Sequence, residues 1–274
     1  MRLVIVVLIL LLPQVTKPQS VSTLMGARSG ALGNASSALS DDWSFHNNFA
    51  GIANSTQTLV NFAYSVPPAL PGANRAAFSL VAPIKSFGAG VGLFRFGDEV
   101  YSEQILSAAI GNRFGLASLG IKVNYVQYSA EGFGTRNALT LDFGGIAELS
   151  DKVSIGAMIT NISQSKLRSN VEERLPTRMT TGVQFRPDGN LTLLIELEKD
   201  LVYDPTFKAG IEYEFYHKFF ARTGFNLNPN IICGGLGYRS SKLSVDYAMQ
   251  YAHSIQTQFQ LSVTYRIIKQ SSKS

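Results

Sequence analysis

Three histidines are the residues of this 274-residue chain best suited to proton transfer near neutral pH. His46 lies close in sequence to two aspartates, His217 falls in a short turn, and His253 stands beside a serine with no carboxylate nearby. The chain has no Ser-His-Asp order, no HExxH, no Gly-x-Ser-x-Gly and no phosphate-binding loop motif. We therefore expect a protein that is not an enzyme.

The remaining composition excludes several kinds of site. The single cysteine, Cys233, cannot form an intrachain disulfide and leaves no basis for a cysteine-rich zinc site. The formal charge is only +5, and the basic residues are scattered without the run or stripe that nucleic-acid binding needs. The sequence thus predicts no metal, no cofactor and no nucleic-acid partner.

The other charged residues fall within short segments that alternate apolar with small or polar residues. One such segment near the C-terminus interleaves two sets, the apolar Phe259, Leu261, Val263, Tyr265 and Ile267 and the polar Gln258, Gln260, Ser262, Thr264 and Arg266. Because side chains alternate faces along a strand, one face of this segment is apolar and the other is polar. A soluble sandwich would cover the apolar face with a second sheet, whereas a membrane barrel turns it toward lipid and keeps charge in the lumen.

Fourteen such segments recur from residue 57 onward, each near the length that a tilted strand needs to cross a bilayer. They are expected at 57–66, 75–84, 87–96, 103–111, 118–128, 137–148, 152–162, 177–186, 190–199, 206–215, 218–226, 231–238, 242–252 and 257–267. The even number and the low share of charged residues, 16% against roughly 25% in soluble domains, favour a membrane barrel. We predict an all-β fold, a closed antiparallel fourteen-stranded outer-membrane barrel over residues 56–268 with a tail at 269–274.

The connections between these segments alternate between long and short. The first, third and fifth are long, at 67–74, 97–102 and 129–136, while tight turns such as 85–86 stand between them. Outer-membrane barrels have short periplasmic turns and longer outer loops. Aromatic residues fall near both ends of the segments, as interfacial girdles do. They are Phe87, Phe185, Phe215, Phe219 and Tyr238 near the turns and Tyr64, Tyr101, Tyr128 and Tyr203 near the loops.

The N-terminal region divides into two parts. Residues 1–22 combine a basic start with a ten-residue apolar run from Leu3 to Leu12, which predicts a cleaved signal peptide and export. Residues 23–55 are rich in Gly, Ala, Ser and Asn and do not alternate like a strand. Small residues allow backbone to pack closely, so we expect residues 23–55, here termed the plug segment, to lie against or inside the barrel.

Mixed charges are predicted to face the barrel interior. By the parity of the alternation they are Lys122, Asp142, Glu196, Glu198, Lys208, Glu212, Arg222 and Asp246. Opposite charges on neighbouring strands can pair, for instance Glu198 with Lys208 and Glu212 with Arg222. We favour a ladder of paired charges over a polar path for a solute, because unpaired charge in a narrow lumen is costly. Glycine also occupies many inward positions, which leaves room for the plug segment or for a ligand.

The stretch at residues 26–53 resembles the N-terminal signature of the PorV/PorQ-like outer-membrane proteins of Bacteroidetes, which in turn resemble FadL fatty-acid transporters. Ala38-Leu-Ser-Asp-Asp42 matches the middle of that signature, and Asn48-Phe-Ala-Gly-Ile52 stands where Asn-Pro-Ala-Gly-Leu is usual. Further segments that look like the family begin at Leu175, Glu198, Phe207 and Arg222, so the resemblance spans the mature chain. The plug residues that it singles out are Gly26, Arg28, Gly33, Asn34, Asp41, Asp42, Asn48 and Gly51.

The resemblance implies two alternative functions. PorV-like members work with type IX secretion, and FadL-like members move hydrophobic molecules through the barrel wall. The modest outer loops favour the first function, an accessory or carrier protein of surface export that contacts secretion-machinery or secreted proteins. The alternative is a channel for a hydrophobic small molecule.

The longest connection, at 163–176, is expected to make the outer contacts. Its charged residues are Lys166, Arg168, Glu172, Glu173 and Arg174. Such a loop suits contact with a protein or a polar surface, although a long charged loop is also simply well solvated. Apart from outer-membrane lipid, the expected partners are exported proteins or a hydrophobic solute, and a soluble exported β-protein remains a third class.

Overall fold

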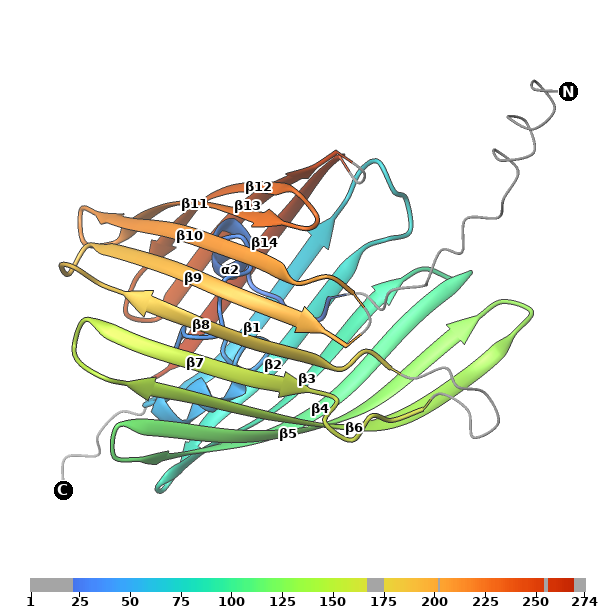
Figure 1. Ribbon diagram of the computed structural model, residues 1–274, viewed down its shortest axis with the longest axis horizontal. Coiled ribbons are helices and arrows are strands. Elements are labelled where there is room, and N and C mark those ends of the chain that lie inside the picture. The colour runs from blue at the N-terminus through green and yellow to red at the C-terminus, as the bar shows by residue number, and fades with distance from the viewer. Residues whose placement is uncertain (1–21, 167–174, 202, 254–255, 269–274) are drawn as a thin grey trace, which may run out of the picture.

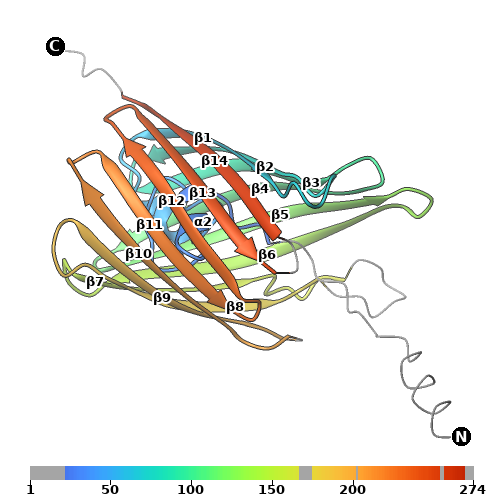
Figure 2. The ribbon, with the colours of Figure 1, turned by 90° about the horizontal axis from the view of Figure 1, so that it is seen from above.

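The computed structural model describes residues 22–166, 175–201, 203–253 and 256–268. Its strands form one antiparallel sheet in sequence order, and the sheet closes where β1 pairs with β14 (Figures 1 and 2). The strands are β1 (Thr58–Val66), β2 (Arg75–Ile84), β3 (Phe87–Gly97), β4 (Tyr101–Phe114), β5 (Ala117–Ala130), β6 (Gly134–Glu148), β7 (Val153–Thr160), β8 (Arg178–Phe185), β9 (Leu191–Asp200), β10 (Thr206–Phe215), β11 (Phe219–Leu227), β12 (Ile231–Arg239), β13 (Leu243–Ala252) and β14 (Gln256–Ile267). The predicted fold class, a closed barrel of fourteen antiparallel strands, is confirmed.

The alternating pattern decides which side of the sheet each residue occupies. On β1, Phe62 is 53% exposed on the outside, while its neighbour Asn61 is fully buried inside. The same contrast follows the other strands, so large apolar side chains cover the exterior. A soluble protein rarely exposes so continuous an apolar surface, whereas a barrel that spans a membrane must. Among the described residues, no helix is long and apolar enough to cross a bilayer.

Three strands run further than the sequence pattern predicted. In β4, β5 and β6 the pairing continues past the apolar band, to Tyr101 opposite Ala130 and Ala130 opposite Gly134. The connections predicted at 97–102 and 129–136 are therefore largely strand, and the β5–β6 hairpin projects beyond the other loops (Figure 1). In contrast, β7 stops at Thr160, because Asn161 turns the chain with a φ of 52°.

The aromatic girdle is only partly as expected. Phe87, Phe185 and Phe219 are exposed on the outer surface near the short turns. Tyr128 and Tyr101 have the parity of inward residues instead. Tyr128 lines an internal cavity, and the hydroxyl of Tyr101 donates to buried Glu103 at 2.7 Å. The pattern assigned these two tyrosines to the wrong face because both faces of β4 and β5 are apolar at this level.

The plug segment lies inside the barrel and contacts both halves of the wall. Its short helix α2 (Ala27–Ala31) packs on β11–β14, and its 3₁₀ helix η1 (Phe49–Asn54) packs on β3–β6 (Figure 2). Inward glycines make this fit possible: a Cβ on Gly156 would lie 1.9 Å from the carbonyl oxygen of Ser37, and one on Gly88 would lie 2.0 Å from that of Ile52. Backbone of the plug segment thus rests directly on backbone of the wall.

Candidate functional site

A network of charges joins the plug segment to β10–β13. The Glu212 carboxylate accepts hydrogen bonds from Arg28 at 2.6 and 2.8 Å and from Arg222 at 2.5 Å. Arg28 also donates to Asp41 at 3.1 Å, and Arg222 donates to Asp246 at 2.7 Å. All five side chains are at least nine-tenths buried by solvent exposure of their atoms or nearly so, with Arg222 fully buried. We call these five residues the charge clamp.

A second network holds the plug backbone against β9. The Glu196 carboxylate accepts the backbone N–H groups of Ser36 at 2.9 Å and Ser37 at 2.7 Å. Lys208 donates to Glu196 at 2.9 Å and to Glu198 at 2.7 Å. The two ion pairs named from the sequence, Glu198 with Lys208 and Glu212 with Arg222, are both present. Most of the predicted inward charges therefore anchor the plug segment or pair with one another.

The plug residues singled out by the resemblance have structural functions. Gly26 and Gly33 have φ values of 106° and 70°, where an L side chain is strained, and Gly33 also touches the carbonyl oxygen of Phe225. Asn48 is fully buried, and its amide donates to the carbonyl oxygens of Ser37 at 2.6 Å and Gly145 at 3.0 Å.

The remaining three complete this set. Asn34 has a φ of 58°, Asp42 pairs with Arg266 on β14, and Gly51 lies against the Ser44 side chain. These contacts fix the path of the plug segment and leave no open site among them.

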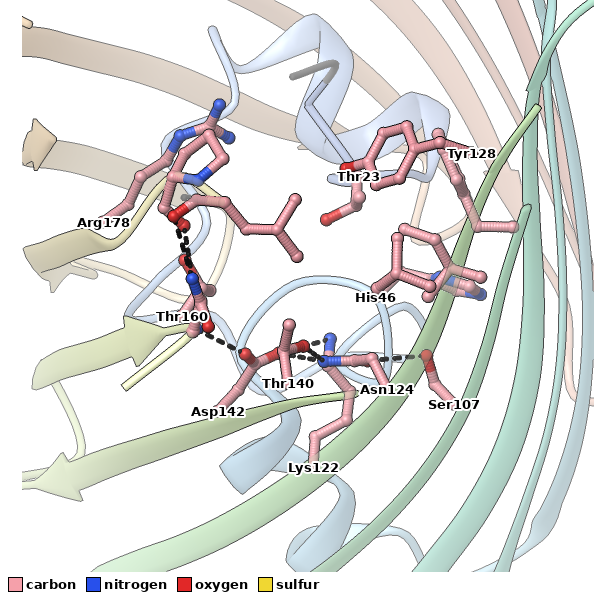
Figure 3. Close-up of a pocket in the computed structure, with 16 residues that line it drawn as sticks. Thr23, His46, Ser107, Lys122, Asn124, Tyr128, Thr140, Asp142, Thr160 and Arg178 are labelled. Carbon is pink, nitrogen blue, oxygen red and sulfur yellow. Dashed lines mark hydrogen bonds and ion pairs between the residues drawn. The ribbon is translucent and has the colours of Figure 1, made fainter. Parts of the chain in front are cut away.

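The last predicted pair, Lys122 and Asp142, lies in a cavity on the loop side of the plug segment. The cavity has a volume of about 90 Å³. Ser107, Lys122, Asn124, Thr140 and Asp142 form one side of it, and Thr23, Tyr128 and Arg178 lie on the other (Figure 3). Its apolar lining comes from Phe94, Ile105, Val126, Leu175 and Pro176. The cavity thus combines a polar floor with apolar walls.

Hydrogen bonds in the floor leave the lysine underused. Asp142 accepts from the Asn124 amide at 2.8 Å and from the Asn161 backbone N–H at 2.8 Å. The Lys122 ammonium lies 3.7 Å from Asp142 and 4.9 Å from the centre of the Phe49 ring. Within the described ranges it makes no hydrogen bond, although its side chain is 10% exposed. An ammonium with free donors beside an apolar wall suits a ligand that presents an oxygen atom.

His46 borders the same cavity but carries no charge there. Its ring Nε2 lies 3.3 Å from the carbonyl oxygen of Phe78. Burial, together with the nearby Lys122 ammonium, lowers the pKa of His46 to about 3. The imidazole is therefore neutral at physiological pH and does not serve as a proton carrier in that range.

A groove on the lipid-facing surface lies behind this cavity. It has a volume of about 410 Å³ and crosses β1–β5. The apolar lining that faces outward consists of Phe62, Ala76, Phe78, Leu93, Leu106 and Tyr125. Its upper edge is polar, because Arg95, Gln104 and Gln127 occupy paired outward positions on β3, β4 and β5. Phe94 and Ile105, which pair across β3 and β4, line both the groove and the internal cavity.

A larger space of about 670 Å³ lies on the turn side of the plug segment. Its lining is mostly polar and includes Arg28, Asp41, Glu212, Arg239 and Arg266. The plug segment and the charge clamp separate this vestibule from the cavity on the loop side. A solute that moved straight along the barrel axis would have to displace both.

Other predicted features gave less. Of the outer-loop residues, Lys166 is exposed, whereas Arg168, Glu172, Glu173 and Arg174 lie outside the described residues, as does nearly all of the predicted signal peptide. In the described part of the chain, no group of three His, Cys, Asp or Glu side chains is placed to hold a metal ion. The sequence pattern missed Phe94 and Ile105, although apolar residues at inward positions of β3 and β4 were a usable signal.

No protein-family model and no curated protein matches this sequence. Solved structures do match the fold. The TodX monoaromatic hydrocarbon channel deltaS2 mutant aligns with a TM-score of 0.70 at 12% identity, covering 89% of this chain and 99% of that channel. A FadL homologue from Pseudomonas aeruginosa aligns with a TM-score of 0.61 at 12% identity, covering 91% and 98%. The resemblance to FadL-type barrels therefore holds for the fold, while nothing distinguishes the PorV/PorQ-like branch.

Proposed function

We propose that this chain is a non-enzymatic protein of the bacterial outer membrane that admits a hydrophobic small molecule through the barrel wall between β3 and β4. The observation that carries the proposal is the position of Phe94 and Ile105, which line an internal cavity on one side and a lipid-facing groove on the other. Only one thickness of sheet separates the two spaces. A short sideways path thus connects the loop side of the barrel with the membrane.

The sizes of the two spaces support a divided path. The groove, at about 410 Å³, falls within the range of small-molecule sites, about 300–1,000 Å³. The cavity, at about 90 Å³, is smaller than the cavity of about 150 Å³ that binds benzene in another protein. It accommodates the polar end of a solute beside Lys122, and the apolar body needs the wall to open. The ladder between β3 and β4 is continuous in this structure, so the path is a gated one.

The axial route is less suitable for an apolar solute. It leads past the charge clamp into the polar vestibule, and burying apolar groups among ion pairs gains nothing. The matching structures include a hydrocarbon channel, and that name supports the proposal only as an analogy of fold.

The competing function is the accessory or carrier protein of type IX-like secretion. It draws on the resemblance of the plug segment to the PorV/PorQ-like signature. No contact in the described residues favours it, since of the loop residues expected to bind a partner only Lys166 is described.

A deletion strain separates the two functions. We expect loss of the gene to slow entry of hydrophobic solutes, tested with a labelled monoaromatic hydrocarbon and a labelled long-chain fatty acid, and to leave the surface proteome intact. Re-expression of the chain should restore entry. Normal entry combined with loss of secreted surface proteins would reject the transport function in favour of secretion.

A further inference from the structure

Each of the six short turns at one end of the barrel carries or adjoins a basic residue. They are Lys85, Arg113, Lys152, Arg186, Lys218 and Lys242, and all six side chains are exposed. We call these residues the basic rim. Because the turns join successive strand pairs, the basic rim runs around the whole circumference of the barrel (Figure 2).

Most of this charge is not neutralised by the protein. Arg113 pairs with Glu148 at 2.8 Å, whereas the other five have no carboxylate within ion-pair distance among the described residues. The same turns contain only Asp151 and Asp188, and the Asp188 carboxylate is occupied by the backbone N–H groups of its own turn. The turn end of the barrel is therefore positively charged.

The loop end does not share this excess. Its exposed or partly exposed charges are of both signs, with Asp98, Glu99, Glu131 and Asp204 against Arg95, Arg136, Lys166 and Lys199. The positive excess is thus confined to one end of the described molecule and is not a property of the chain as a whole.

Aromatic side chains place the basic rim at the depth of lipid head groups. Phe87, Phe114, Phe185 and Phe219 each lie within two residues of a rim residue, and each is exposed on the outer surface. Aromatic belts mark the boundary between hydrocarbon and head groups. The long stems of Lys and Arg just beyond such a belt reach the head-group layer.

Two turns keep their side chains at a conformational cost. Lys85 has a φ of 52°, and the turn before Lys218 has Tyr216 at 53° and His217 at 55°. Hairpin turns with positive φ prefer Asn and Gly, which adopt this conformation with less strain. A lysine and an exposed tyrosine in these positions indicate that the side chains themselves are needed.

We propose that the basic rim binds the head groups of anionic phospholipids in the leaflet next to the short turns, the periplasmic leaflet of the outer membrane. A protein partner docks on one side of a barrel and needs a patch, whereas lipid surrounds the barrel and meets every turn. Basic residues next to a bilayer attract acidic lipids by simple electrostatics, an effect that salt screens. This inference does not depend on the passage of a solute.

The test is lipid selectivity in a reconstituted membrane. The full chain is placed in mixed phosphatidylethanolamine and phosphatidylglycerol vesicles, and spin-labelled versions of both lipids report which of them contact the barrel. We expect the phosphatidylglycerol label to associate roughly threefold more strongly than the phosphatidylethanolamine label, and the preference to fall with added salt.

Variants locate the effect. Changing Lys85, Lys152, Arg186, Lys218 and Lys242 together to Gln should abolish the preference, while Lys→Arg changes at the four lysines should keep it. The matched control, R136Q with K166Q at the loop end, should leave it unchanged. Heat-dependent gel mobility checks that each barrel is folded. Absence of any preference in the wild type, or equal loss in the loop-end control, would overturn the proposal.

Discussion

The two halves of the barrel hold the plug segment in different ways. Around α2, the wall of β9–β13 is charged, and buried carboxylates and guanidinium groups connect strand to plug. Around η1, the wall of β3–β6 holds a single ion pair among the described residues, that of Lys122 with Asp142, and otherwise offers glycines and apolar side chains. The comparison indicates that the charged half anchors the plug segment, whereas the apolar half leaves a cavity beside a wall that can open.

The largest effect is expected from E212Q in the charge clamp. This change leaves the guanidinium groups of Arg28 and Arg222 short of one negative charge in a buried site. The cost should be about 3–5 kcal/mol in the free energy of unfolding. Urea unfolding in lipid vesicles, followed by gel mobility, measures it.

The control for this comparison is an ion pair at the surface. Glu148 pairs with Arg113, and the two side chains are 37% and 47% exposed. E148Q should cost less than about 1 kcal/mol. Equal losses from E212Q and E148Q would contradict the view that the charge clamp anchors the plug segment.

The next effect concerns the backbone contact between wall and plug. In G156A, the new Cβ would lie 1.9 Å from the carbonyl oxygen of Ser37, so the plug segment has to shift. We expect a loss of about 1–3 kcal/mol in the same unfolding assay. At Gly189 a Cβ meets nothing within 4 Å, so G189A should stay within about 0.5 kcal/mol of the wild type. A plug segment that does not touch the wall would make the two changes alike.

A pH effect is expected from His46 on the apolar side. Its pKa of about 3 in the folded chain lies below the ordinary value of 6.5, so the folded state favours the neutral ring. Stability is therefore lost as the pH falls through 6.5 toward 3, by about 2 kcal/mol at about pH 5. H46Q should remove this part of the decline. Identical pH profiles of the two proteins would mean that His46 is not buried as described.

The smallest effect on stability, but a clear one on transport, is expected from A76W. Ala76 lines the lipid-facing groove, and an indole there fills it while facing hydrocarbon. Solute entry should fall, with unfolding within about 0.5 kcal/mol of the wild type. The control A221W faces lipid on β11, away from the groove, and should not alter entry. Equal entry in A76W and the wild type would remove the groove from the path.

The alternation in the sequence was sufficient for the barrel and for its inward charges. It placed Lys122 and Asp142 inside and named two ion pairs correctly, because on these strands only one face is apolar. It was wrong for Tyr128, which sits where both faces of β5 are apolar and parity carries no information. The cavity was also beyond reach, since its shape depends on where η1 and the turn at Asn161 come to rest.

A reversible crosslink between β3 and β4 tests the central claim most directly. Phe94 and Ile105 are paired residues, so F94C with I105C brings two thiols to the separation that a disulfide spans. The paired positions Ser244 and Thr264, on β13 and β14, give the matched control crosslink. We predict that oxidation of F94C/I105C stops entry of the hydrophobic solute, that reduction restores it, and that S244C/T264C has no such effect. Unchanged entry through the oxidised F94C/I105C protein would contradict passage through this wall.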